Sequence, residues 1–239
     1  MKKRLQNILA LSGVASRRAS GTLIEKGIVK VDGKVVRERG ARFDPEEHVI
    51  TVRGKEIKAE EKKLYFLFNK PAGVISTVID THGRKKVTDF FRDVDARFYP
   101  VGRLDKDTTG VMILTNDGEL AHRLSHPSFG VEKEYLAVSS LKLDDRALKA
   151  VSSGVDIDGK KTAPCLVSEI ADPQGRNVYR VRLHEGKKRQ IRVMFVSVGA
   201  KITELDRTRY AGLSAEGLKR GERRELTDGE IKTLRSLVL

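Results

Sequence analysis

Short runs in which apolar and polar residues alternate, separated by tight turns, constrain the fold of this chain more than any other feature. Asp32-Gly33 and Asp158-Gly159 each lie between two such runs, an arrangement typical of β-hairpins. Strand patterns outnumber helical ones and often follow one another directly, which favours antiparallel pairing. We therefore predict an α+β fold with a largely antiparallel mixed sheet flanked by helices.

A short polar segment, Ala59–Lys63, divides the chain into two parts. Its composition is typical of a linker. We expect a small domain over residues 1–60 and a larger one over residues 64–239.

The small domain begins with two helical patterns. The first ends at Ser12-Gly13, and the second covers Arg17–Lys26 with Ser16 as its N-cap. In this second helix we expect Ala19 and Leu23 to face the core.

In the larger domain the patterns predict four clear strands and four helices. The strands are Leu64–Asn69, Val74–Val78, Val131–Ser139 and Val178–Leu183. The helices are one that Asn116 and Glu119 cap and His126-Pro127 ends, Asp144–Ser152, Lys187–Val198 and a C-terminal one that begins at a Thr227/Glu230 capping box. Two further apolar runs, Arg97–Val101 and Val111–Thr115, bracket a glycine-flanked loop.

Charge indicates the class of partner. The chain has 47 Lys and Arg against 33 Asp and Glu, a net charge of +14, and residues 1–60 alone have 14 against 8. Such a surplus favours a polyanion, most often nucleic acid. Thermal adaptation enriches both signs of charge, and a membrane surface would call for a basic amphipathic helix with bulky aromatic residues, which the sequence lacks.

No apolar segment is long enough for a membrane span or a signal peptide, and Cys165 stands alone. We expect a cytoplasmic monomer that does not bind a membrane. The five histidines do not share the spacing of metal ligands, although His122 and His126 are four residues apart, so we expect no metal site.

Basic side chains gather near the start of the chain. A helix whose first turn carries two arginines offers guanidinium groups and backbone N–H groups to a phosphate. Any one of these residues alone would be read as an ordinary surface side chain. As a group we expect them to bind RNA: Lys2, Lys3, Arg4, Arg17, Arg18 and Lys26.

The glycine-flanked loop, Gly102–Gly110, places Asp105 between two apolar runs. A carboxylate on a loop held by two strands is well placed for catalysis, although an Asp in a turn more often serves the turn itself. Asp107 lies in the same loop, and spacing does not separate the two acids.

The first sixty residues resemble the S-four type of RNA-binding domain. The resemblance rests on Arg4-Leu5, Gly13, Ser16–Ala19, Ile24, Gly27, Val29, Val31–Gly33 and Val36. It implies a small αL-type RNA-binding domain.

Residues 64–239 resemble the RsuA/RluB-type pseudouridine synthases, which also carry an N-terminal domain of the S-four type. Five motifs match in order: Asn69–Gly73, Gly102–Gly118, Leu124–Pro127, Glu132–Tyr135 and Glu185–Arg192. The resemblance implies an enzyme that isomerises a specific uridine of ribosomal RNA to pseudouridine, without a cofactor.

The resemblance also implies roles for single residues. Asp105 matches the aspartate that attacks the target uridine and breaks its base–ribose bond. Tyr135 matches the tyrosine that packs on the flipped base, and its part in proton transfer stays open. Arg192 matches the basic residue that pairs with the aspartate, and Arg103 matches an arginine that occupies the space left by the extruded base.

These residue types suit the reaction. A guanidinium lowers the pKa of a neighbouring carboxyl, an aromatic ring stacks on a base, and a base inside folded RNA must be flipped out before it reacts. Lys188 and Val193 depart from the family pattern, and the run after Gly110 reads Val-Met-Ile-Leu; the first two could alter RNA contacts. Two alternatives stay open: a non-catalytic RNA-binding or ribosome-assembly factor on this fold, and a glycosidase with paired carboxylates.

Overall fold

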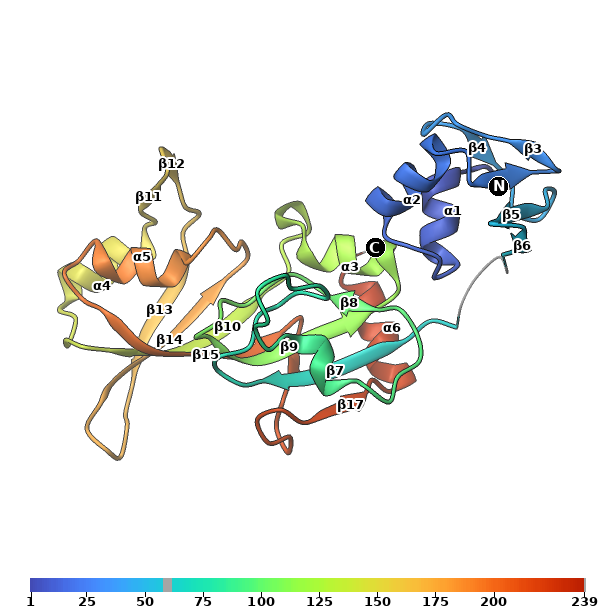
Figure 1. Ribbon diagram of the computed structural model, residues 1–239. Coiled ribbons are helices and arrows are strands. Elements are labelled where there is room, and N and C mark those ends of the chain that lie inside the picture. The colour runs from blue at the N-terminus through green and yellow to red at the C-terminus, as the bar shows by residue number, and fades with distance from the viewer. Residues whose placement is uncertain (58–61, 239) are drawn as a thin grey trace. The chain divides into compact units, whose positions relative to one another are not determined.

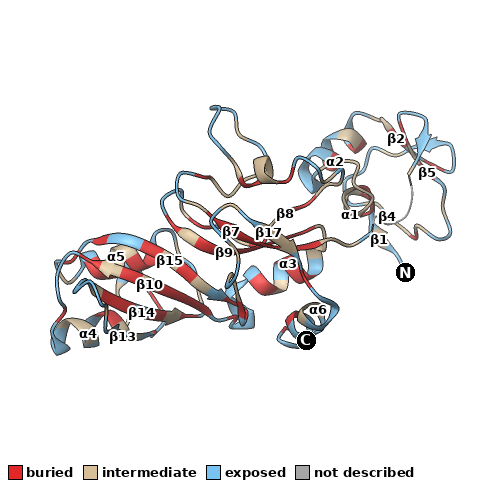
Figure 2. Cartoon of the chain, turned by 90° about the horizontal axis from the view of Figure 1, so that it is seen from below, coloured by how far each residue is buried: buried red, intermediate tan, exposed pale blue. Residues whose placement is uncertain are grey.

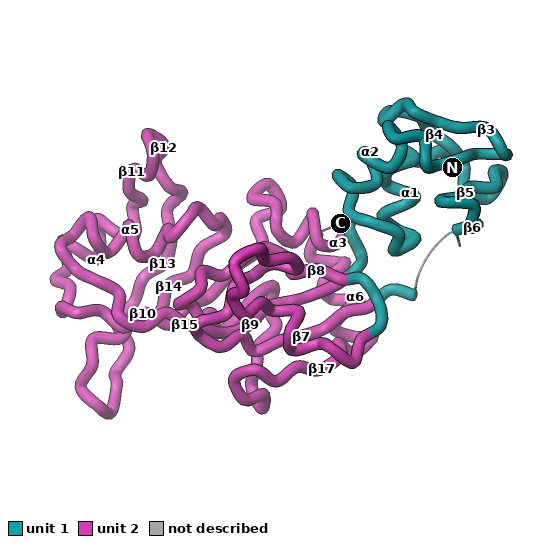
Figure 3. The backbone as a smooth tube through the Cα atoms, viewed as in Figure 1, with its two compact units in different colours: residues 1–63, 95–97, 116–118 teal, residues 64–94, 98–115, 119–239 magenta. Residues whose placement is uncertain are grey.

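The computed structural model describes residues 1–57 and 62–238. These fall into two compact units (Figure 3): residues 1–63 with 95–97 and 116–118 form unit 1, and residues 64–94, 98–115 and 119–239 form unit 2. Most of the expected linker, at residues 59–61, lies outside the described residues.

Unit 1 packs two helices against short strands around a core that includes Leu5, Ile8, Leu9 and Ile24. The helices are α1 (Leu5–Leu11) and α2 (Arg17–Glu25), and the strands are β1 (Lys3–Arg4), β2 (Val29–Val31), β3 (Lys34–Val35), β4 (Arg42–Phe43), β5 (Ile50–Val52) and β6 (Lys55–Glu56). The sheet order is β3-β2-β5-β6, and β1 pairs with β4.

Local sequence signals explain the main features of unit 1. The hydroxyl of Ser16 accepts from the N–H of Ala19 at 3.1 Å, which confirms the predicted N-cap. Asp32 and Gly33 both have positive φ, of 48° and 78°, as a two-residue hairpin turn requires. One prediction was wrong: Ala19 is exposed, and α2 buries Ser20, Gly21 and Ile24 instead.

Unit 2 is built on one mixed sheet (Figure 1). Its order is β13-β14-β10-β15-β9-β7-β17, with β16 beside β15 and β8 beside β9. The strands are β7 (Tyr65–Lys70), β8 (Tyr99–Pro100), β9 (Thr109–Thr115), β10 (Lys133–Ser139), β13 (Leu166–Ile170), β14 (Asn177–Leu183), β15 (Ile202–Tyr210), β16 (Leu213–Ser214) and β17 (Arg223–Glu225); β11 (Asp156–Ile157) and β12 (Lys160–Lys161) form a separate hairpin. Among the described pairs only β9 and β15 run parallel, which confirms the predicted largely antiparallel α+β fold.

Helices cover both faces of this sheet. They are α3 (Gly118–Ser125), α4 (Asp145–Ser152), α5 (Gln190–Val196) and α6 (Asp228–Ser236), with 3₁₀ turns η1 (Val87–Phe90) and η2 (Pro127–Phe129). Alternate residues of β7 pack into different cores. Phe66 and Phe68 face the core that α4 and α5 share, whereas Tyr65 and Leu67 face α3 and α6. Figure 2 shows the resulting buried band along the central strands.

Two predictions for unit 2 need correction. Val74–Val78 is not a strand, because Ile75 makes a single bridge to Lys86 and the rest of the segment is irregular. The helix predicted over Lys187–Val198 begins only at Gln190. The sequence pattern also does not predict β15, the longest described strand, although it lies in the middle of the sheet. None of the described helices is both long and apolar enough to cross a bilayer.

Candidate active site

A pocket of about 400 Å³ in unit 2 brings together the loop, strand and helix that the sequence singled out. Asp105 and Arg103 come from the loop before β9, and Tyr135 comes from β10. The other lining residues are Gly102, Leu104, Thr108, Leu183, Gly186, Lys187, Lys188, Arg189, Gln190, Ile191 and Leu205. Asp105 is half-buried, Arg103 is exposed and Tyr135 is buried.

The backbone beside Asp105 is held by Gly73 and by Ser76, which lies in the segment predicted as a strand. The hydroxyl of Ser76 donates to the carbonyl of Leu104 at 2.7 Å and accepts from the Leu104 N–H at 3.0 Å. The N–H of Gly73 donates to the carbonyl of Lys106 at 2.9 Å. The backbone of Ile75 bonds to Lys85 and Val87 instead, so the segment joins the Asp105 loop through the Ser76 side chain and not as a strand.

Lys70, the last residue of β7, binds the same loop through its side chain. Its side chain is fully buried, and its ammonium donates to the carbonyls of Pro71 at 3.0 Å, Lys106 at 3.2 Å and Thr108 at 2.8 Å. Burial lowers the pKa of Lys70 to about 8, while the charges of Asp107 and Asp105 oppose that shift. A buried cation thus fixes the loop and places positive charge near both acids.

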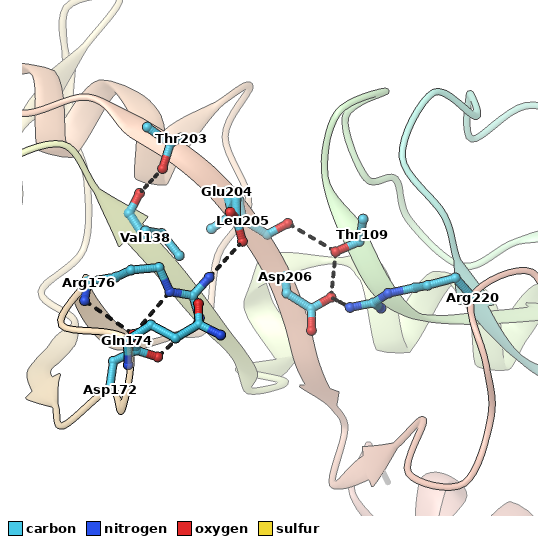
Figure 4. A network of polar contacts seen from close by, with 10 residues as sticks. All are labelled: Thr109, Val138, Asp172, Gln174, Arg176, Thr203, Glu204, Leu205, Asp206 and Arg220. Carbon is cyan, nitrogen blue, oxygen red and sulfur yellow. Dashed lines mark hydrogen bonds and ion pairs between the residues drawn. The ribbon is translucent and has the colours of Figure 1, made fainter.

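The far end of the loop joins β15 (Figure 4). The hydroxyl of Thr109 donates to the Asp206 carboxylate at 2.6 Å, and Arg220 forms an ion pair with the same carboxylate at 2.8 Å. Next to it, Gly110 lies so close to β15 that an added Cβ would be 2.2 Å from the carbonyl oxygen of Arg207. Glycine is needed at this junction because the two backbones almost touch.

Tyr135 is held in the middle of the sheet. It lies opposite Val181 of β14 and Arg207 of β15, with a register shift between Glu134 and Tyr135 on the β15 side. The carboxylate of Glu134 accepts from Arg182 at 2.7 Å, which links β10 to β14 at this point. Tyr135 is buried and its strand pairs with a neighbour on each side, so the ring is kept in place at the pocket wall.

The segment between β14 and α5 forms another wall of the pocket. Glu185 accepts from the side chain of Gln190 at 2.6 Å and from the N–H of Ala163 at 2.9 Å. The ammonium of Lys187 donates to the carbonyls of Lys160 and Lys161, at 2.7 and 3.0 Å. These bonds attach the β11–β12 hairpin to the pocket wall.

Arg189 explains why α5 begins later than predicted. It has a φ of 53°, in the left-handed region that non-glycine residues seldom adopt, and it occupies the N-cap position. Residues before it therefore cannot continue the helix, and they line the pocket instead. Backbone of this kind is often found at functional sites.

The structure does not form the ion pair that was predicted between Arg192 and Asp105. Arg192 donates to the carbonyl of Ile202 at 2.8 Å, and no ion pair joins it to Asp105 in the described part of the chain. Burial and the charge of Arg189 lower the pKa of Arg192, while Asp105 and Asp107 act to raise it. The guanidinium is therefore close enough to be influenced by Asp105, but its hydrogen bond holds it to β15.

Sequence reasoning missed Lys70 and Ser76 as residues of the site. Lys70 lies in a motif that was quoted, Asn69–Gly73, but a lysine is expected to be exposed, and nothing local indicates full burial. Ser76 lies outside the quoted motifs, so the sequence does not point to it as a residue of the site. A group of at least three His, Cys, Asp or Glu side chains suited to a metal is not found in the described part of the chain.

The basic residues expected to bind RNA all lie in unit 1. Lys2, Arg4, Arg17, Arg18 and Lys26 are exposed, and Lys3 is half-buried in β1. Arg17 and Arg18 occupy the first turn of α2, as the sequence predicts.

Comparison with known families and proteins covers both units. The family model described as RNA pseudouridylate synthase matches residues 64–197, and the S4 domain model matches residues 3–49. The chain is 42% identical over 237 residues to the ribosomal large subunit pseudouridine synthase B of Bacillus subtilis, covering 98% of this chain and 96% of that protein. It is 36% identical over 239 residues to the dual-specificity RNA pseudouridine synthase RluF of Salmonella typhi, covering 98% and 79%.

A solved structure is similar over nearly the whole chain. It is described as the crystal structure of pseudouridylate synthase, with a TM-score of 0.69 and 28% sequence identity, and the match covers 97% of this chain and 99% of that one. The arrangement of strands and helices around the pocket is therefore shared with a protein of that description.

Proposed function

The chain belongs to the RNA pseudouridylate synthase family, as an RsuA/RluB-type enzyme with an N-terminal S4 domain, and we propose that Asp105 is its nucleophile. One observation carries the assignment: Asp105 and Tyr135 line the same pocket, although thirty residues separate them in the chain. Asp107 is exposed and is not among the lining residues, which favours Asp105 of the two acids.

The reaction is an isomerisation, so atoms balance without a co-reactant. The carboxylate of Asp105 attacks C1′ of the ribose, and the bond between N1 of the base and C1′ breaks as an ester bond between Asp105 and C1′ forms. The uracil turns, C5 attacks C1′, and the ester bond breaks so that the Asp105 carboxylate is released. The proton on C5 is then lost while N1 gains one. Tyr135 stacks on the base that the enzyme has flipped out, and Arg103, exposed at the pocket, occupies the vacated space in the RNA.

Arg192 acts on Asp105 through its field. Its hydrogen bond to Ile202 keeps it at a fixed position on the β15 side, and the charge of Asp105 acts to raise the pKa of this arginine. The ammonium of Lys70, which bonds to the loop, adds a second positive charge. Both cations thus act near Asp105 without a direct ion pair that substrate would have to displace.

We assign the substrate as ribosomal RNA of the large subunit. The Bacillus subtilis relative is described as acting on that subunit, and it matches this chain over almost its full length. The net charge of +14 suits such a polyanion. This substrate implies a cytoplasmic protein, and we propose that it acts as a monomer.

The test is release of tritium from ribosomal RNA labelled at C5 of uracil. We expect the wild-type protein to release tritium and Asp105→Asn to release none above background, while both bind the RNA with similar affinity. Asp107→Asn is the matched control in the same loop, and it should keep turnover within a few-fold of wild type. Full turnover by Asp105→Asn would refute the assignment, and RNA binding without any turnover by the wild type would favour a non-catalytic factor.

A further inference from the structure

An exposed group of aromatic rings lies at the end of α3, outside the pocket. We call His122, His126 and Phe129 the aromatic cluster; their ring centroids are 5.2 Å (His122–His126), 6.3 Å (His122–Phe129) and 6.4 Å (His126–Phe129) apart. All three are exposed, and Phe129 keeps 37% of its surface in contact with solvent. The fold thus holds three rings together without burying them.

Local bonds fix the positions of these rings. The Nδ1 atom of His126 accepts from the N–H of Ser128 at 3.3 Å and lies 2.7 Å from the Ser128 hydroxyl. Gly130, with a φ of 60°, ends the turn η2 just after Phe129. The guanidinium of Arg123 is held by the carbonyl of Val238 and by Glu119, both at 2.8 Å, and lies 5.9 Å from the Phe129 ring. A ligand would therefore meet an ordered surface, which lowers the entropy cost of binding.

The aromatic cluster is connected to the walls of the pocket on two sides. Gly102 lines the pocket, and a Cβ added there would lie 4.0 Å from the Cβ of Ser125, the residue before His126. Leu183 lines the pocket from the other side, and the Nδ1 atom of the next residue, His184, is 2.6 Å from the carbonyl of Gly130. Through these contacts the aromatic cluster adjoins the pocket wall, where nucleotides that flank a uridine bound in the pocket would pass.

Exposed aromatic rings next to a fixed cation are the usual means by which proteins bind unpaired bases. We propose that the aromatic cluster is a second base-binding site, on which an unpaired nucleobase flanking the target uridine stacks. This inference rests on the proposed function, since that function supplies the RNA. It assigns the cluster a role in substrate selection, separate from the reacting groups.

The first experiment measures RNA binding, so that it does not depend on turnover. The probe is large-subunit ribosomal RNA transcribed in vitro, and the proteins are full-length Asp105→Asn and the same chain with Phe129→Ala added. We expect Phe129→Ala to raise Kd on the order of tenfold, the loss typical of one stacked base, and Phe129→Trp to restore affinity. Val196→Ala removes another exposed apolar side chain, from α5, and should leave Kd unchanged.

The second experiment assigns the contact to a base. Abasic nucleotides are placed one at a time on either side of the uridine that the wild type modifies, and Kd is measured for both proteins. At one flanking position the abasic change should weaken binding by the parent protein but not by Phe129→Ala, because the partner is already gone. The proposal would be overturned if the two proteins had equal Kd values. It would also be overturned if the effects of the abasic change and of Phe129→Ala on binding were additive at every position, and the cluster would then be better explained as a protein contact.

The two proposals fail in different ways. If the wild type releases no tritium, the proposed function fails, and the Kd comparison on intact RNA still decides whether the cluster binds RNA. If tritium is released and Phe129→Ala changes neither KM nor Kd, only the stacking inference fails. With both correct, Phe129→Ala raises KM and leaves kcat within about twofold, since the reacting groups are untouched.

Discussion

At the scale of single residues, the ammonium of Lys70 determines how the Asp105 loop is held. It is the one group in the described structure that bonds to both the Lys106 and Thr108 carbonyls, which flank the loop's turn. A nucleophile that is misplaced by about 1 Å loses on the order of 100-fold in rate. The position of Asp105 therefore depends on a residue that never meets the substrate.

We expect Lys70→Met to lower kcat on the order of 100-fold while KM for RNA changes little, because the loop loses its donors but the surface is unchanged. The pKa of Lys70 is lowered to about 8, so its charge is lost as pH rises through that value. Wild-type kcat should accordingly fall above pH 8, and the variant should lack that fall. Tritium release across pH 6.5–9.5 measures both effects.

Lys133 provides the matched control. It is also buried, its pKa is also lowered to about 8, and it bonds to Val131 and His184 instead of to the loop. Lys133→Met should destabilise unit 2 as much as Lys70→Met does, measured by urea unfolding, yet lower kcat far less. Equal losses of kcat in the two variants would show that general destabilisation, and not loop position, is responsible.

At the scale of elements, the junction of β9 and β15 joins two antiparallel parts of the sheet. The two strands pair through Asp206 with Thr109 and through Arg207 with Gly110. Arg207 is buried there, donates to the carbonyl of Val111 at 2.8 Å and lies 4.5 Å from the ring of Tyr210. The loop of Asp105 ends at this junction, so its geometry follows from how closely the strands approach.

We expect Gly110→Ala to lower the free energy of unfolding by at least about 2 kcal/mol and to abolish turnover, since the added Cβ meets backbone atoms that cannot move aside. Gly199→Ala is the control: Gly199 has a φ of 81°, like Gly110 at 108° a positive value, but nothing lies near its missing Cβ. Urea unfolding should separate the cost of close approach from the cost of φ. A loss no larger than that of the control would contradict this account of the junction.

The same junction shows where the sequence stops being informative. Signals that act within one turn of chain, such as the hydroxyl of Ser16 on Ala19 and that of Thr227 on Glu230, were read correctly because both partners are neighbours in the sequence. Strand β15 was missed because Arg207 occupies a buried position, which breaks the apolar alternation. Its burial depends on Val111 and Tyr210, and only the folded sheet brings Val111 to it.

In the site, too, the sequence identifies some residues but not the contacts that they make. Motif resemblance led to Asp105, Tyr135 and Arg103, which do line one pocket. It also suggested an Arg192–Asp105 ion pair that does not form, since the carbonyl of Ile202 takes that guanidinium. A residue type can be matched along a sequence, whereas its hydrogen-bond partner depends on which acceptors the fold brings near.

At the scale of the whole molecule, positive charge is spread over both units. Residues 1–60 carry 14 basic and 8 acidic side chains, and the chain as a whole carries 47 and 33, so the remainder contributes 33 basic and 25 acidic ones. Affinity for RNA should therefore fall steeply with salt, because each phosphate contact releases counterions. Charge of this kind favours binding to any RNA, and specificity must come from a subset of contacts.

We propose that Arg17 and Arg18, exposed on the first turn of α2, make phosphate contacts of this kind. The double variant Arg17→Ala/Arg18→Ala should raise Kd for large-subunit ribosomal RNA, and should reduce the slope of log Kd against log salt by roughly 2, about one for each lost contact. Turnover at saturating RNA should be unchanged, because neither residue lies at the pocket.

Loss of charge alone would also weaken binding, so the control must remove the same charge elsewhere. Arg146 and Lys149 are exposed on α4 of unit 2, and Arg146→Ala/Lys149→Ala lowers the net charge equally. If the first turn of α2 contacts phosphate directly, only its variant should reduce the slope, because a distant charge changes the potential but releases no counterion. Equal reductions in both variants would mean that the positive surface acts as a whole, without a defined contact at α2.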